Sequence, residues 1–441
     1  MDKLLDNELT ARKFYKFVMP SILMLVFISL YSIVDGMFVA NFVGSDALAA
    51  INIIMPISGL ILGISLMFAS GSSAIVAILL GEGKKDEACE KFTLICIIAF
   101  VVGVIFGAIG FIFIDKVILL LGATPRLYEY CKIYGQIMIF SAPFAFLGII
   151  YEYYIRIDGR PGFTLFLYIA GGVTNLVLDY VFIVLMKMEM MGAALATATG
   201  FFVTFAIGAY YFGSGRSKIK YKRPKMELKY VRDLMINGSS AMVSELSTGI
   251  TTLIFNLAVL RIAGEDGVAA LSIVLYAEFL LVSAYLGFSM GVSPLISYSY
   301  GAKRFDQIAK ILKYSKVFIF ISSIIIFLSA EFLAPWISLI FVRPDTVVYK
   351  MATSGLELFA IAFLFIGINV FASGMFTAYA NGKISAVISF SRSLVFVCLG
   401  IFILPRFFEI DGVWLTVPFA ECITILLSVY FLKKYRNTYH Y

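Results

Sequence analysis

The stretch Val18–Phe42, VMPSILMLVFISLYSIVDGMFVANF, decides the fold, because Asp35 is its only charged residue. It exceeds the roughly 20 apolar residues that a helix needs to cross about 30 Å of hydrocarbon. A strand of a membrane barrel would instead show about ten residues of alternating polarity. The segment is therefore predicted to be a transmembrane helix.

Further apolar runs of the same kind recur along all 441 residues, of which 61% are hydrophobic and only 14% charged. A soluble domain could not bury that much apolar surface. The chain is predicted to be an all-α integral membrane protein with twelve transmembrane helices. The remaining eleven runs are Leu48–Leu80, Phe92–Ile114, Ile133–Tyr154, Phe163–Met186, Met191–Phe212, Ser239–Leu260, Val268–Tyr300, Val317–Phe341, Ala352–Ala380, Ile384–Leu404 and Gly412–Leu432.

The basic residues predict the orientation. With twelve spans both termini share one side, and 26 of the 35 Lys and Arg residues flank that side, including Lys84, Lys85, Arg156 and the stretch Arg216–Arg232. Only eight lie on the other side. Lys and Arg accumulate on the cytoplasmic side of membrane proteins. We therefore expect a multi-pass protein of a bacterial-type plasma membrane with both termini cytoplasmic. The net charge of +7 would face anionic lipid rather than nucleic acid.

Comparison of the chain with itself reveals an internal repeat. A shift of 220 residues superimposes many identical residues, which are mostly small or apolar and are expected to pack helices: Ala49 on Ala269, Gly71 on Gly291, Gly81 on Gly301, Gly135 on Gly355 and Gly192 on Gly412. A repeat of six spans predicts two pseudo-symmetric six-helix lobes related by an axis along the membrane normal. The predicted division is a first lobe at 1–215, a basic cytoplasmic connector at 216–236 and a second lobe at 237–441.

Polar residues that occur in only one half are the better candidates for function, because ionisable side chains inside a membrane are costly. In the first half these are Asp35 in span 1, Asn175 and Asp179 one turn apart in span 5, and Thr197 in span 6. Hard cations prefer oxygen ligands, and two nearby carboxyl groups raise each other's affinity for a proton. The four residues are predicted to bind Na⁺ or H⁺. The alternative is that the two acids only hydrogen-bond neighbouring helices.

The second half carries its own acids, Glu245, Glu278 and Glu357 in spans 7, 8 and 10. They are candidates for substrate binding or for coupling in the second lobe, and packing roles are equally open. Arg392 is a candidate to neutralise one of them. Two further acids, Glu331 and Glu421, are expected near helix ends.

Enzymatic chemistry is not expected. The single histidine, His440, lies at the far end of the chain, and the five cysteines form no CxxC pair or metal spacing. No nucleophile–base motif is evident, and no cofactor is predicted. An ion channel is a further alternative, although it would not need two lobes.

Local motifs resemble the multidrug and toxic compound extrusion family, in its bacterial MepA-like and DinF-like branches. The motifs are Pro20, the run Asp35-Gly-Met-Phe-Val-Ala-Asn-Phe-Val-Gly44, Gly81-Glu-Gly83 and Arg156-Ile-Asp-Gly159. The resemblance implies that Asp35, Asn175, Asp179 and Thr197 form the cation site and that span 1 bends at Pro20. Ile149 stands where the family has a span 4 asparagine. In other branches acids of spans 7 and 10 serve the cation or the drug, and Glu245 and Glu357 lie in those spans.

The resemblance also implies an antiporter that exports organic cations or several drugs in exchange for Na⁺ or H⁺, by alternating access between the lobes. A monomer acting on small cationic or amphipathic molecules is expected. Two related functions stay open: a flippase for lipid-linked oligosaccharides and an exporter of a flavin-like metabolite.

Overall fold

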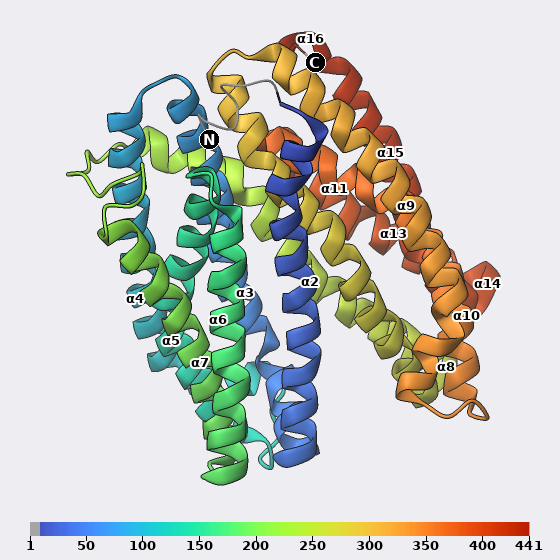
Figure 1. Ribbon diagram of the computed structural model, residues 1–441. Coiled ribbons are helices and arrows are strands. Elements are labelled where there is room, and N and C mark those ends of the chain that lie inside the picture. Colours follow the sequence, from blue (N-terminus) through green and yellow to red (C-terminus); the bar gives the residue numbers. More distant parts are fainter. Residues whose placement is uncertain (1–8, 441) are drawn as a thin grey trace.

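The computed structural model describes residues 9–440, and the secondary structure in that part of the chain is helical, without a strand (Figure 1). Apolar runs bounded by Gly and charged turns produce these helices, because in lipid each backbone polar group must be satisfied within its own segment. The first half forms α2 (Ala11–Phe42), α3 (Ser45–Gly81), α4 (Lys85–Leu120), α5 (Tyr128–Ile157), α6 (Pro161–Asp179), the π-helix η1 (Tyr180–Leu185) and α7 (Glu189–Gly213).

The second half repeats this pattern with more interruptions. It consists of α8 (Leu228–Gly301), α9 (Phe305–Phe341), α10 (Val347–Ala360), α11 (Phe363–Ala378), α12 (Gly382–Phe390), the π-helix η2 (Ser391–Val395), α13 (Phe396–Ile403), α14 (Pro405–Trp414), α15 (Thr416–Lys434) and α16 (Arg436–Tyr439).

Twelve spans can be traced in the described residues. Ten helices are long and apolar enough to cross a membrane, and α10 with α11 forms a further span that is bent by 53°. One of the ten is α8, whose 74 residues turn at Gly264, where φ is +66°. A straight helix of that length would measure about 110 Å, so its two arms are separate spans. The predicted twelve-helix fold is confirmed, although the break in the predicted run Ala352–Ala380 was not foreseen.

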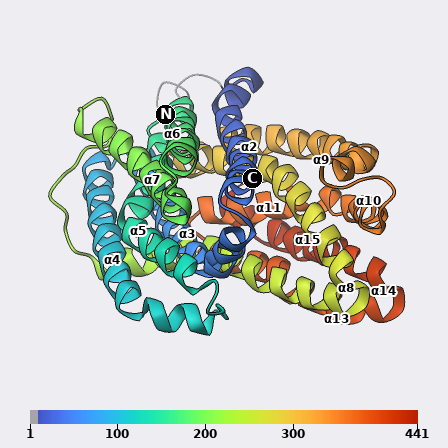
Figure 2. The ribbon, with the colours of Figure 1, turned by 90° about the horizontal axis from the view of Figure 1, so that it is seen from below.

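The two halves form two lobes, seen end-on in Figure 2. They meet through glycines at pseudo-equivalent places. A Cβ on Gly81 of α3 would lie 2.2 Å from the Tyr298 carbonyl oxygen of α8, and one on Gly301 would lie 2.1 Å from that of Ile78. Gly81 and Gly301 are partners in the sequence repeat. The duplicated glycines therefore let the helix backbones of the two lobes touch, as their predicted packing role requires.

The close contacts between the lobes lie toward one end of the molecule along the direction of its helices. Gly71 of α3 approaches the backbone of Gly238 at the start of α8, while Gly291 near its end meets Val18 on α2. Hydrogen bonds join the lobes there too, from Asn237 Nδ2 to the Gly71 carbonyl at 3.3 Å and from the Tyr15 hydroxyl to the Tyr314 carbonyl at 3.3 Å. This end of the molecule contains the start of α2, the end of α15 and the connector (Figure 1).

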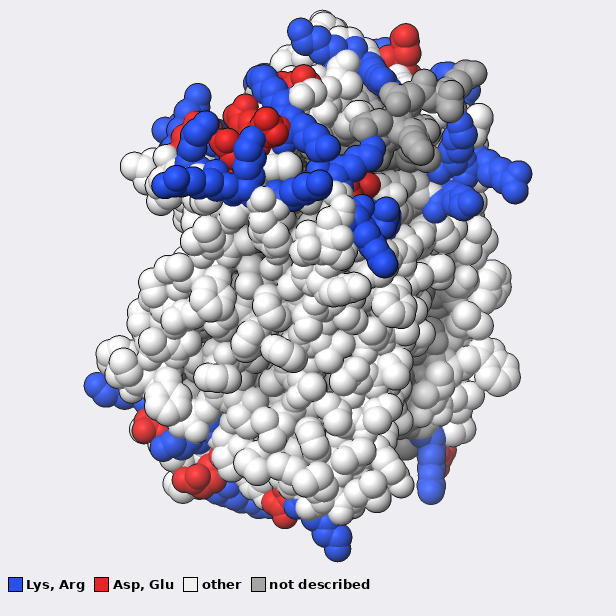
Figure 3. All heavy atoms as spheres, turned by 60° about the vertical axis from the view of Figure 1, so that its left-hand side comes forward, with Lys and Arg blue, Asp and Glu red and all other residues white. Residues whose placement is uncertain are grey.

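Charged side chains gather at the two ends of the molecule. Figure 3 shows many Lys and Arg residues at the upper end, fewer charges at the lower end and an uncharged belt between them. Arg156, counted above with the basic flank, is an exception, because its side chain is fully buried and pairs with Glu152 one turn earlier. The Tyr168 hydroxyl donates to the same carboxylate at 2.8 Å. Arg156 therefore faces the interior of the first lobe and not lipid headgroups.

The connector is shorter than predicted and lies against the first lobe. Helix α8 already begins at Leu228, because Tyr230 and Leu234 are buried and continue the helical pattern through residues 228–236. Glu227 forms an ion pair with Lys91 of α4, and Lys222 pairs with Asp86 at 3.1 Å. The Lys91 ammonium lowers the pKa of Glu227 below its ordinary value. The connector is therefore held by the start of α4.

Candidate functional site

Three helices of the first lobe bring the predicted cation residues together. Asp35 comes from α2, Asn175 and Asp179 from successive turns of α6, and Thr197 from α7. Residues four apart share a face of a helix, so both α6 side chains point toward the same neighbours. Asn175 and Asp179 are fully buried, whereas Asp35 and Thr197 are half-buried.

Glycines allow these helices to approach. A Cβ on Gly171 of α6 would lie 2.5 Å from Thr204 Oγ1 and 3.2 Å from the Gly200 carbonyl oxygen, both on α7. A Cβ on Gly172 would lie 2.9 Å from the ring of Phe27 on α2. Small residues at these positions bring α6 close to both partners. The distances from α6 to α2 and α7 at the site therefore depend on the absence of side chains at Gly171 and Gly172.

The carboxyl groups of Asp35 and Asp179 lie within hydrogen-bonding contact of each other. Asp179 Oδ1 is buried without a hydrogen-bond donor among the described residues. Two adjacent carboxylates in a medium of low dielectric constant repel each other strongly unless a proton or a cation lies between them. The pair is therefore suited to hold one exchangeable positive charge.

Asn175 connects the acidic pair to the rest of the site. The amide orientation that satisfies both of its ends donates to Asp179 Oδ2 at 3.3 Å and to the Tyr31 hydroxyl at 3.1 Å. In that orientation it accepts from the Thr197 N–H at 3.1 Å, whereas the opposite orientation donates to Thr197 Oγ1 at 3.3 Å. Assignment of the amide rests on this network. In either orientation Asn175 joins α6 to α7.

Two tyrosines complete the site, and neither was predicted. Tyr31 precedes Asp35 by one turn of α2, so the four-residue spacing was an available signal. Tyr134 of α5 lies beside Thr197 and near both aspartates. Nothing in its local sequence distinguishes it from the other tyrosines. It contributes a hydroxyl from span 4, the span in which Ile149 replaces the family's asparagine.

Asp179 is the last residue of α6 before the π-helix η1. Wide turns of this kind are frequent at functional sites, since they displace side chains from the regular helical register. Pro20 lies within α2, which continues as one helix from Ala11 to Phe42. Bending at Pro20 therefore stays a prediction.

The three second-lobe candidates lie in different places. Glu245 approaches Gly63 of α3, where a Cβ would lie 3.7 Å from that of Glu245, so it faces the boundary between lobes. Glu357 on α10 lies near Glu331 on α9. Glu278 on the second arm of α8 faces Arg392 and Glu421. They therefore do not form one site.

Glu421 and Arg392 belong to a buried polar network. Arg392 Nη1 donates to Glu421 Oε1 at 2.9 Å, and Asn369 Nδ2 donates to Oε2 at 2.7 Å. Ser428 Oγ donates to Asn369 Oδ1 at 2.8 Å. Glu421 lies in the second turn of α15, near the start of that helix, and inside the second lobe, where Arg392 compensates its charge. Glu331 also lies within α9, well before its end at Phe341.

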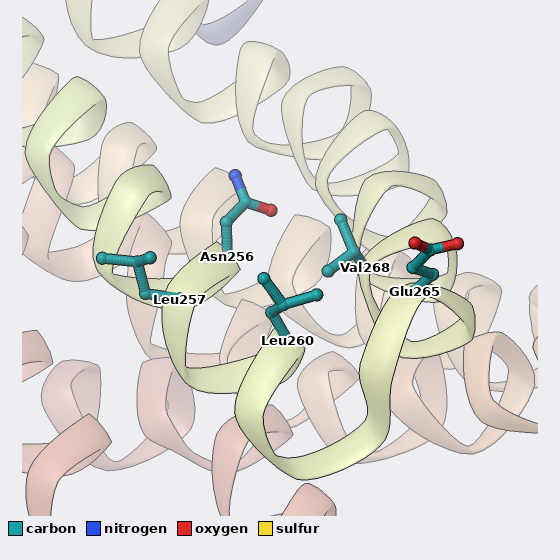
Figure 4. A pocket seen from close by; sticks show the side chains of 5 residues that line it. All are labelled: Asn256, Leu257, Leu260, Glu265 and Val268. Atoms are coloured by element: carbon teal, nitrogen blue, oxygen red, sulfur yellow. The ribbon is translucent and has the colours of Figure 1, made fainter. Parts of the chain in front are cut away.

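A small surface pocket of about 250 Å³ lies at the turn of α8 and holds none of these residues. Asn256, Leu257 and Leu260 line it from the arm before Gly264, and Glu265 and Val268 from the arm after it (Figure 4). Its lining is mostly apolar, and neither Asp35 nor Asp179 contributes to it. It is not part of the candidate cation site.

The chain matches the profile of the MatE family twice, over residues 20–181 and 241–402. The two matched segments have the same length and are 221 residues apart, which agrees with the repeat detected in the sequence. Together they cover well over half of the chain.

Curated relatives extend the similarity to nearly the full length. The multidrug export protein MepA of Staphylococcus saprophyticus is 27% identical over 427 residues, covering 92% of this chain and 91% of the relative. MepA of Staphylococcus aureus is 25% identical over 432 residues, covering 95% and 93%.

Solved structures share the fold. A MATE protein in complex with MaL6 superimposes with a TM-score of 0.93 at 19% identity, covering 98% of this chain and 97% of that one. An outward-facing multidrug resistance MATE transporter gives 0.92 at 19% identity, covering 97% and 96%. With the double family match, these similarities show that the chain belongs to the MatE family and is a membrane transporter of the multidrug and toxic compound extrusion type, not an enzyme.

Proposed function

We propose that this protein exports small organic cations from the cell in exchange for Na⁺ or H⁺. The family and the MepA relatives support export of small molecules across the cell membrane. The observation that carries the coupling is the contact between Asp35 and Asp179. Further oxygen atoms lie near it, including the hydroxyls of Tyr31 and Tyr134, as a hard monovalent cation or a proton requires.

The charge at this site is linked mechanically to the packing of the lobes. Helix α2 carries Asp35 and Tyr31 in its second half and contacts α8 through Val18 and Ser21 in its first half. Pro20 lies within that contact, where it removes one backbone donor and weakens the helix locally. Loss of the shared cation would drive the Asp35 and Asp179 carboxylates apart and would therefore move a helix that also joins the two lobes.

The proposed cycle places the basic end in the cytoplasm, as the excess of Lys and Arg there favours. A cation entering from the opposite side neutralises the acidic pair and drives release of the substrate. One monovalent cation moving through 100 mV supplies about 2.3 kcal/mol. Exchange for a singly charged substrate cancels this electrical contribution, so such transport would rely on the ion gradient alone unless two cations enter.

The test is ethidium efflux from proteoliposomes with Na⁺ and proton gradients imposed separately. Wild-type protein should export ethidium in response to at least one gradient, and Asp35→Asn should fold normally but lose that response. Asp345→Asn, in the exposed loop after α9, is the matched control and should transport normally. Gradient-driven efflux by Asp35→Asn at the wild-type rate would remove the assignment.

A further inference from the structure

One acid in the second lobe has no use in the proposed coupling. Glu278 faces the Arg392–Glu421 ion pair, yet no hydrogen bond or ion pair reaches its carboxylate from the residues of 9–440. The guanidinium of Arg392 is committed to Glu421 at 2.9 Å. Two carboxylates and one guanidinium leave one negative charge uncompensated.

Glu278 also lies at a depth that a transported molecule must pass. It follows the Gly264 turn by 14 residues of helix, about 20 Å along α8. A hydrocarbon core is about 30 Å thick, so that distance places Glu278 within it. An unpaired carboxylate there is costly, so its presence calls for a partner that arrives from outside the protein.

Hydrogen bonds fix the side chains around Glu278, and part of the surface there is exposed. Asn369 and Ser428 hold Glu421 in place, so the ion pair cannot easily turn toward Glu278. Arg392 lies in the π-helix η2, and its side chain keeps 19% of its surface exposed. Glu278 is itself half-buried. A molecule can therefore reach the carboxylate without dismantling the network.

We propose that Glu278 binds the positively charged group of the transported organic cation within the second lobe. The Arg392–Glu421 pair serves as a neutral support, because an arginine that is already paired leaves Glu278 available for a cation. The proposal rests on the proposed function, since it names a contact for its substrate. It separates the substrate from the coupling ion, which binds in the first lobe.

The experiment measures ethidium binding to purified protein in detergent, without any ion gradient. Glu278→Gln should weaken binding by at least about tenfold, because the carboxamide keeps the shape but not the charge. Glu331→Gln, a half-buried acid of the same lobe outside the network, should bind like the wild type. Glu278→Asp keeps the charge and should bind more tightly than Glu278→Gln, which controls for a purely structural loss.

Wild-type affinity in Glu278→Gln would overturn the proposal, as would equal loss in Glu278→Asp and Glu278→Gln. Failure of the proposed function gives a different result. In that case ethidium efflux ignores both gradients in the wild type, or persists in Asp35→Asn, whatever Glu278→Gln does to binding.

Discussion

Two buried acidic sites, one in each lobe, are compensated in opposite ways. In the first lobe Asp35 and Asp179 lie in hydrogen-bonding contact, and no Lys or Arg among residues 9–440 is paired with either of them. In the second lobe Glu421 has the guanidinium of Arg392 at 2.9 Å. Glu421 thus has a permanent counter-ion, whereas the Asp35–Asp179 pair must obtain a mobile one. An acidic pair without a fixed counter-ion gives a coupling ion one defined place to act.

The largest effect should come from giving the Asp35–Asp179 pair a permanent cation as well. Thr197→Lys would place an ammonium group beside the acidic pair, and ion-driven ethidium efflux should fall by more than roughly tenfold. Thr197→Met has similar bulk without the charge and should retain more transport. Wild-type efflux in the lysine variant would show that the acidic pair does not exchange its cation.

The converse change removes the permanent cation from the second lobe. Arg392→Met leaves Glu421 buried and unpaired, which typically costs about 3–5 kcal/mol, less here because Arg392 is partly exposed. Thermal unfolding in detergent should show the loss. Arg392→Met combined with Glu421→Gln should recover much of it. Unchanged unfolding in the single variant would mean that the ion pair contributes little.

A smaller effect should follow from separating the helices that hold the first-lobe site. Gly171→Ala brings a Cβ to 2.5 Å from Thr204 Oγ1, and overpacking of this kind costs about 1–3 kcal/mol. Asn175 would move away from Thr197, so the concentration of Na⁺ or H⁺ needed for half-maximal efflux should rise. Gly162→Ala, at a site of the same helix with nothing within 4 Å of its Cβ, is the control. If both variants need the same ion concentration for half-maximal efflux, the distance between α6 and α7 does not determine the affinity for the ion.

The smallest effect concerns the stability of the connector. The connector packs against the first lobe, through the ion pair between Glu227 and Lys91. Lys91 lowers the pKa of Glu227 from its ordinary value of 4.5. The ionised pair therefore stabilises the connector above that value and is lost as pH falls through the lowered pKa. Proteolysis of residues 214–227 should stay slow from neutral pH to about 5 and accelerate in stronger acid. Glu227→Gln should be cleaved faster at neutral pH, and equal rates there would argue against the ion pair.

Much of this architecture was predictable because lipid imposes simple rules. Apolar run length predicted the spans, and residues that differ between the halves pointed to Asp35 and Asp179, which the structure brings together. The π-helices, the 53° bend after Ala360 and the contribution of Tyr134 were not predictable, because they depend on packing between distant helices. No Pro or Gly marks that bend. The burial of Arg156 was likewise hidden, since a charged residue near a helix end is usually solvated.

The attachment of the connector to α4 has a practical consequence for following the transport cycle. Tyr221 packs against Phe92 with ring centroids 5.3 Å apart, and the Lys222 N–H donates to Thr93 Oγ1 at 2.9 Å. A spectroscopic label on this segment would thus travel with the first lobe. Paired with a second label on α9, it would record rocking of one lobe against the other from a position accessible in intact membranes.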